Sequence, residues 1–314
     1  MSDDLMFRVI KRYYILKENQ DTIAQSESTS KSTISRLLKK AEKLGYVRHV
    51  VDVPIKSQDH LEGKLIEKYG LKRARVVPTD DSDNLGLIMF NVTLSAGQFL
   101  NQIVKANDII GVSWGETMTA FANNLPEYGG KISNVQVVQL NGSISEQREL
   151  MNGDSIVRRI AANYDAKGYV LPTPSFVDSP EVAEALKKDS MISKNFELME
   201  KSNITIFSVG SMRDNSVLIE AGYFTKEDYA ELRKNDYRGD ICSRYIKSDG
   251  SYVNDDLYNR GLGISLDSLK KKECNMGLVA GKDKSQAAIA ALKGGYITHL
   301  FIDEDTAEKI LAED

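Results

Sequence analysis

The sequence has few of the residues from which metal centres and disulfide frameworks are built. Its 314 residues include two cysteines, Cys242 and Cys274, and three histidines. Two cysteines are too few for a disulfide framework or a four-cysteine zinc site. No apolar run approaches the roughly 18 residues of a membrane span, and the N-terminus lacks the basic-then-apolar order of a signal peptide. These absences predict a cytoplasmic protein with reduced thiols, no metal site and no membrane segment.

The composition that remains is that of an ordinary folded protein, with 41% hydrophobic and 27% charged residues. At roughly 150 residues per domain, the length predicts two domains. Charge is divided unevenly between them: residues 1–56 carry 11 Lys or Arg against 7 Asp or Glu, a net of +4, and the remainder carries a net of −8. This asymmetry predicts that only the segment 1–56 contacts a polyanion.

The strongest helical pattern lies between Ser30, a suitable N-cap, and Gly45, a suitable stop. Apolar residues recur there at the spacing of one helix face, namely Ile34, Leu37, Leu38, Ala41 and Leu44. Two shorter helical segments precede it, and three short helices ending in a basic, hydroxyl-rich one predict a helix-turn-helix. A solvated basic helix in an ordinary bundle would show the same periodicity. In a helix-turn-helix, the start of the last helix contacts bases and its Lys and Arg hold phosphates. The predicted DNA-binding residues are Lys31, Ser32, Thr33, Ser35, Arg36, Lys39 and Lys40.

Residues 57–314 alternate between short strand-like segments and helical lengths. This alternation predicts an α/β domain with a largely parallel sheet covered on both faces. The strand-like segments are ARVVP, DIIGVSW, NVQVVQL, GYVLP, NITIFSVG, GDICSRYI, GLGISL, NMGLVAG and ITHLFID. In open parallel sheets ligands bind beyond the carboxyl ends of the strands, so the residues that follow the strands are the candidates for a binding site.

Two of these junctions have the chemistry of an anion site. After DIIGVSW, the free N–H groups of a helix start that follows Gly115, together with the hydroxyl of Thr117, can hold an anion. A lysine at a helix start, such as Lys284, opposes the helix dipole unless an anion is bound there. At the other junctions Asn and Asp side chains can bond sugar hydroxyls, although turn formation alone would explain the Asn-Gly pair. The candidate ligand-binding residues are Gly115, Glu116, Thr117, Asn141, Gly142, Asp214, Asp240, Gly281 and Lys284.

Taken together, these motifs resemble the SorC family of bacterial sugar-responsive transcriptional regulators. The run TIAQSESTSKSTISRLLKKAEKLGYV is similar to the family's N-terminal motif. The segments IGVSWGETM, VVQLNGSIS and VAGKDKSQAAIAALKGGYITHLFIDEDTAEKIL are similar to its effector-binding domain. Within the family, FSVGSMRD and GDICSRY most resemble the bacillary deoxyribonucleoside-regulator branch. The resemblance covers nearly the whole chain.

The resemblance implies a helix-turn-helix DNA-binding domain in residues 1–56. It also implies an effector-binding and oligomerisation domain in 57–314, similar in fold to sugar-phosphate isomerases and deaminases. The implied partners are operator DNA, a phosphorylated sugar effector and further copies of the chain in a dimer or tetramer. No catalytic residue and no cofactor is implied. Gly115, Glu116 and Thr117 would line the phosphate loop and Lys284 would close on the phosphate, while the sugar would be faced by Asn141, Gly142, Asp214 and Asp240.

The sequence departs from the family pattern in two places. In the helix-turn-helix, Glu27 stands where the family has an apolar residue, Ser28 where it has Gly, and Thr29 where it has an aliphatic residue. These changes thin the small core of the turn. In the effector domain, some relatives hold an aldehyde sugar as an imine, which needs a lysine amine. Asn141 stands at that position, so we expect non-covalent binding unless Lys282 or Lys284 substitutes.

Two other interpretations remain open at this point. One is a sugar-phosphate isomerase or deaminase with an added N-terminal helical region, since a fold does not fix a function. The basic helix and the lack of a convincing acid/base pair disfavour this enzyme. The other is a regulator whose DNA-binding domain has decayed, as Glu27 and Ser28 would suggest.

Overall fold

The computed structural model describes residues 3–47, 58–79, 84–144 and 153–314. The chain divides into two compact units, Met1–Val53 and Pro54–Asp314. This division lies three residues before the predicted boundary at 56/57, which itself lies outside the described residues. Within the described residues, none of the helices has both the length and the apolarity needed to cross a bilayer.

The first unit is a small helical bundle. Its elements are α1 (Asp3–Ile10), a π-helical turn η1 (Lys11–Ile15), α2 (Gln20–Ser26) and α3 (Lys31–Lys43). Ser30 caps α3 as predicted, because its side chain accepts a hydrogen bond from the Thr33 N–H at 3.2 Å. The buried core consists of Met6, Val9, Ile23, Ala24, Ile34, Leu37, Leu38 and Ala41.

One residue of the predicted apolar face does not join this core. Leu44 is 52% exposed. It lies one residue beyond the end of α3, where the backbone turns and the helical spacing no longer directs a side chain inward. The other four predicted positions, Ile34, Leu37, Leu38 and Ala41, are buried as expected.

A seven-stranded parallel sheet forms the centre of the second unit, which confirms the predicted fold class. Its strands, in spatial order, are β1 (Arg73–Val77), β10 (His299–Asp303), β9 (Cys274–Val279), β5 (Ile204–Ser208), β2 (Ile109–Val112), β3 (Gln136–Gln139) and β4 (Lys167–Tyr169). Every neighbouring pair of these strands is parallel.

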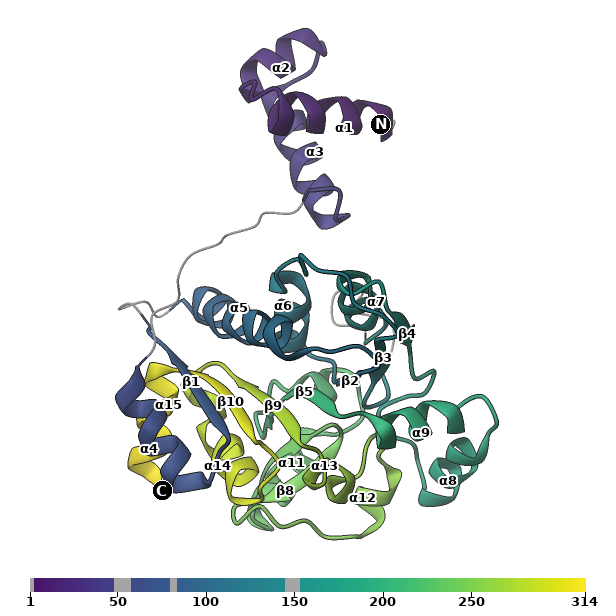
Figure 1. Ribbon diagram of the computed structural model, residues 1–314. Coiled ribbons are helices and arrows are strands. Elements are labelled where there is room, and N and C mark those ends of the chain that lie inside the picture. Colours follow the sequence, from purple (N-terminus) through teal and green to yellow (C-terminus); the bar gives the residue numbers. More distant parts are fainter. Residues whose placement is uncertain (1–2, 48–57, 80–83, 145–152) are drawn as a thin grey trace. The chain divides into compact units, whose positions relative to one another are not determined.

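Helices cover both faces of this sheet (Figure 1). On one face lie α5 (Leu85–Ile103), α6 (Glu116–Asn124) and α7 (Gly153–Asn163). On the other lie α4 (Asp59–Tyr69), α9 (Ser193–Lys201), α13 (Leu266–Lys270), α14 (Ser285–Lys293) and α15 (Glu304–Glu313). Successive strand residues alternate between the two cores: Leu278 packs into the first and Val279 into the second. This alternation explains why the strands read as continuous apolar runs.

A second, three-stranded antiparallel sheet was not predicted. It contains β6 (Gly210–Ser211), β7 (Tyr237–Ile241) and β8 (Arg244–Lys247). The segment GDICSRYI, predicted as one strand, is a hairpin, because Cys242 and Ser243 adopt φ of +50° and +66° and reverse the chain. GLGISL is also not a strand: it forms isolated bridges and then enters α13. The remaining elements are α8 (Pro180–Lys188), α10 (Val217–Glu220), α11 (Lys226–Lys234), α12 (Asp256–Arg260) and the 3-10 turn η3 (Lys282–Lys284).

Candidate functional site

A cavity of about 330 Å³ lies beyond the carboxyl ends of β2, β3, β5 and β9. This is where ligands bind in open parallel sheets. Six of the predicted effector residues line it: Gly115, Glu116, Thr117, Asn141, Asp240 and Lys284. One cavity is therefore lined by three separate segments: the loop after β2, the start of α14 and the β7–β8 hairpin.

One end of the cavity is suited to an anion. The Lys284 Nζ donates hydrogen bonds to Thr117 Oγ1 at 2.9 Å and to Ser208 Oγ at 2.8 Å. Gly115 precedes α6 with φ of +128°, a conformation that a side chain would strain, and it leaves the N–H groups of the helix start open. Burial lowers the pKa of Lys284 to about 8, against the attraction of Asp283. At neutral pH the lysine is still largely protonated.

A carboxylate, Asp240, also lines the cavity. Asp240 Oδ2 accepts a hydrogen bond from the Ser243 N–H at 3.3 Å. Burial raises the pKa of Asp240 to about 6, and the Ser243 N–H and the charge of Lys284 oppose this rise. Asp240 is therefore mostly ionised at neutral pH and can accept hydrogen bonds from ligand hydroxyls.

Several buried polar atoms in the cavity have no hydrogen-bond partner among the described residues. Asn141 Nδ2 donates to Ser243 Oγ at 3.0 Å, while Asn141 Oδ1, Ser113 Oγ and Ser211 Oγ are unpartnered. Asn141 and Ser113 are only 3% and 4% exposed. A buried unsatisfied polar group costs about 1–3 kcal/mol, so a ligand that supplies hydroxyl partners here relieves an existing penalty.

Much of the cavity wall was not predicted from the sequence. Trp114 lines it and is held by a hydrogen bond from its Nε1 to the Gly142 carbonyl at 2.5 Å. An ion pair between Arg213 and Asp283, both partly exposed, also lines it. Trp114 lies directly between Ser113 and Gly115, so its position after a strand was a signal available in the sequence. The Arg213–Asp283 pair joins segments 70 positions apart, and no local sequence pattern indicates it.

Three predicted effector residues do not line the cavity. Asp214 is 59% exposed and accepts a hydrogen bond from Arg233 Nη1 at 2.9 Å, because the loop after β6 turns its side chain toward α11. Gly142 lies behind the wall, where an added Cβ would be 1.9 Å from the Pro174 carbonyl oxygen. The N–H of Gly281 donates to Asp303 Oδ2 at 2.8 Å. Gly142 and Gly281 thus shape the site without facing the ligand.

In the first unit, the predicted DNA-binding residues lie on the surface of α3. None of the seven is buried in the core, although Thr33 and Ser35 are partly covered. Lys31 Nζ is 2.8 Å from Asp21 Oδ2, and both side chains are more than 60% exposed. Ser32 Oγ and Thr33 Oγ1 lie within 2.9 Å of Ser30 Oγ. The surface of α3 therefore presents cations and hydroxyls to the outside.

Known proteins match both the sequence and the fold. The model of the sugar-binding domain family matches residues 53–312. The deoxyribonucleoside regulator of Bacillus subtilis is 34% identical over 307 residues, which cover 98% of this chain and 97% of that protein. A solved DeoR family transcriptional regulator from Listeria monocytogenes is 29% identical, with a TM-score of 0.72 over 80% of this chain and 98% of that one. The full-length sorbitol operon regulator SorC of Klebsiella pneumoniae has a TM-score of 0.74 at 24% identity, over 99% of this chain and 100% of that one.

Relatives that match nearly the whole chain are named as transcriptional regulators, and the chain shares their sugar-binding domain, so the class of protein is a ligand-responsive transcriptional regulator. The chain belongs to the SorC family of sugar-binding transcriptional regulators, as the sequence motifs predicted. The alternative of an isomerase or deaminase is thereby set aside.

Proposed function

We propose that this regulator controls genes of carbohydrate or nucleoside catabolism and responds to a phosphorylated sugar bound without a covalent bond. The observation that carries the proposal is that one cavity holds both a cation and groups that bond hydroxyls. Lys284, bonded to Thr117 and Ser208, supplies a cation, and Asp240 and Asn141 in the same cavity supply groups that can bond hydroxyls. A ligand with a phosphate at one end and hydroxyls at the other matches both.

Two features support reversible binding. The amide of Asn141 is not a nucleophile, so it cannot form an imine. The amine of Lys284 is held by hydrogen bonds that it donates to Thr117 Oγ1 and Ser208 Oγ. Its charge is available to the phosphate.

We assign DNA binding to the first unit through Lys31, Ser32, Thr33, Ser35, Arg36, Lys39 and Lys40, and effector binding to the second. The exposure of the α3 cations supports the first assignment. Because helix-turn-helix proteins read two half-sites, we also propose a homo-oligomer. A protein that binds the operators of a bacterial genome works in the cytoplasm.

A panel of phosphorylated and free pentoses and hexoses tests the effector assignment. A ligand present at 100 times its dissociation constant adds about 2.7 kcal/mol to the free energy of unfolding, which thermal denaturation detects. The single tryptophan, Trp114, lines the cavity and provides a second readout by fluorescence. We expect stabilisation by a phosphorylated sugar and little by its free form. Equal stabilisation by both forms, or by neither, would contradict the proposal.

A further inference from the structure

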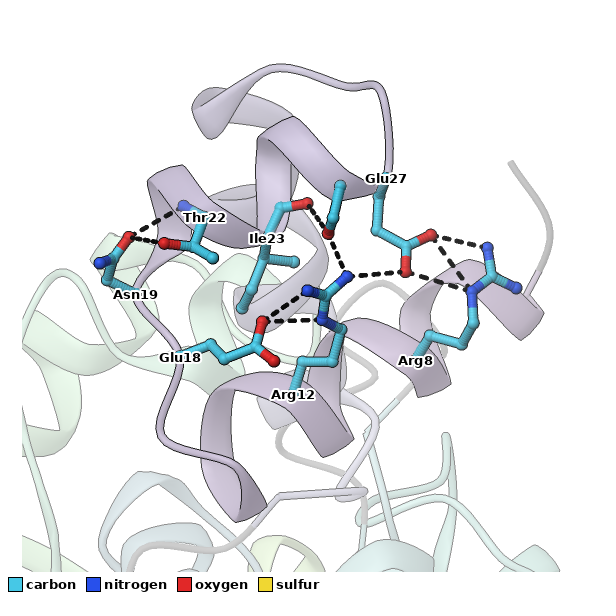
Figure 2. Close-up of polar contacts among 8 residues, drawn as sticks. Arg8, Arg12, Glu18, Asn19, Thr22, Ile23 and Glu27 are labelled. Atoms are coloured by element: carbon cyan, nitrogen blue, oxygen red, sulfur yellow. Dashed lines mark hydrogen bonds and ion pairs between the residues drawn. The ribbon is translucent and has the colours of Figure 1, made fainter.

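The turn between α2 and α3 is held by a cluster of ion pairs (Figure 2). Glu27, at the end of α2, receives hydrogen bonds from Arg8 Nε at 3.2 Å and Arg8 Nη2 at 2.9 Å. Arg12 Nη1 lies 3.5 Å from the other carboxylate oxygen. The Glu27 side chain is only 13% exposed, so most of this acid is covered by the bundle. The family has an apolar residue at this position.

Arg12 extends the cluster on its other side. Its Nε and Nη2 lie 2.8 Å and 2.6 Å from Glu18 Oε2. Arg12 also donates to Ser26 Oγ, which donates in turn to the Ile23 carbonyl at 3.1 Å. The cluster therefore ties α1 and η1 to the last turn of α2. Planar guanidinium groups bound through two nitrogens fix orientation as well as distance.

Besides the cluster, the turn has two backbone hydrogen bonds, which the Ser28 and Thr29 N–H groups donate to the carbonyls of Gln25 and Ala24 at 3.3 and 2.9 Å. Ser28 adopts φ of +49°, a left-handed conformation that is unfavourable for a residue with a side chain. From α2, only Ile23 and Ala24 are buried in the core. The apolar contacts on this side of the bundle are few, and the backbone of the turn is strained. Both conditions raise the dependence of the turn on the ion pairs of Glu27.

We infer that Glu27 is a positioning residue for DNA recognition, because its bonds to Arg8 and Arg12 fix the turn from which α3 begins. The inference rests on the proposed reading of DNA by α3. Glu27 does not itself contact DNA; it sets the direction in which Ser32, Thr33 and Arg36 are presented. The ion pairs of Glu27, which have a fixed geometry, thus take the place of a small apolar core at the turn. On this inference the helix-turn-helix has not decayed.

Binding of two duplexes separates this role from simple loss of folding. One duplex is selected from a random pool by the unchanged full-length protein, and the other has the same composition in scrambled order. A loss of folded protein or a change of charge alters affinity for both duplexes alike. A change in the orientation of α3 weakens binding only to the selected duplex. Contacts with bases require accurately placed side chains, whereas attraction to phosphates does not.

We expect Glu27→Gln to reduce the ratio of the two affinities roughly tenfold, the size expected when one good base contact is lost. Glu27→Asp, which keeps the charge, should restore most of the ratio. Asp4→Asn removes one exposed acid of α1 from the same unit and should leave the ratio unchanged. All measurements are made well below the unfolding midpoint of each variant.

An unchanged ratio in Glu27→Gln, or equal losses on both duplexes, would overturn the inference. If Glu27→Gln does not fold, the pair Ser28→Gly and Glu27→Gln/Ser28→Gly gives the same comparison with the backbone strain removed. Failure of the unchanged protein to prefer any duplex would instead refute DNA recognition by the chain itself, and the inference with it.

Discussion

Lys284 and Thr117 are 167 positions apart in the sequence, and the lysine Nζ donates a hydrogen bond to the threonine hydroxyl at 2.9 Å. This contact joins the end of β9 to the end of β2 across the intervening strand β5, which contributes Ser208 as the second partner of Lys284. The proposed phosphate site therefore depends on three strands at once.

Replacement of either residue should weaken a phosphorylated effector selectively. A hydrogen bond to a charged group contributes about 1.5–3 kcal/mol, so Thr117→Ala and Lys284→Ala should each lower affinity roughly ten- to a hundredfold. Titration calorimetry with phosphorylated and free forms of the sugar measures this. Lys282→Ala is the matched control, because that lysine is paired with Asp305 at 2.7 Å and does not line the cavity. Equal losses for the two ligand forms would place the phosphate elsewhere.

Effector affinity should depend on pH in a bell-shaped manner. Above about pH 8 Lys284 loses its proton, so the attraction for phosphate decreases. Below about pH 6 Asp240 gains a proton and becomes a weaker acceptor for ligand hydroxyls. Affinity should be highest between these values. The Asp240→Asn variant has no carboxylate to titrate at this position, so the part of the affinity loss at low pH that comes from Asp240 should be absent. At low pH the variant and the unchanged protein should therefore bind the effector with similar affinity. An Asn variant that remains weaker by the same factor at every pH would exclude this carboxylate as the titrating group.

Reduction by borohydride should leave the protein unmodified. We expect intact-mass measurement after treatment with a saturating phosphorylated aldose to show the mass of the chain alone, because Asn141 replaces the amine required for an imine. Lys284→Ala and Lys282→Ala serve as controls for any adduct that does form. A stable adduct that disappears in one of them would show covalent capture by that lysine.

Binding of duplex DNA should depend on the cations of α3. Lys39→Ala/Lys40→Ala should weaken binding to all sequences and reduce the slope of log affinity against log salt by roughly one or two. Changes at Ser32, Thr33 or Arg36 should instead alter sequence preference. Lys187→Ala/Lys188→Ala, in α8 of the second unit, removes the same charge elsewhere. If both double variants behave alike, α3 is not the DNA-binding surface.

The sequence could predict the features that depend on neighbours along the chain. The buried face of α3, its Ser30 cap and the strand-to-helix junctions at Thr117 and Lys284 follow from periodicity and local chemistry. The side-chain pairings could not be predicted in this way. Asp214 was expected beside the sugar but pairs with Arg233, and the partners of Glu27 lie 15 and 19 positions away. Such pairs depend on how the helices and strands pack against one another, and local sequence patterns do not show that packing.

The cavity is bounded by two separate sheets. Lys284, Thr117 and Ser208 belong to the seven-stranded sheet and its connections, whereas Asp240 and Ser243 belong to the antiparallel hairpin. A molecule bonded to both groups would add a second, reversible link between two sheets that the Asn141–Ser243 hydrogen bond already joins. Filling the cavity would then stiffen the hairpin as well as occupy space, and amide hydrogen exchange in β7 and β8 would slow with effector concentration.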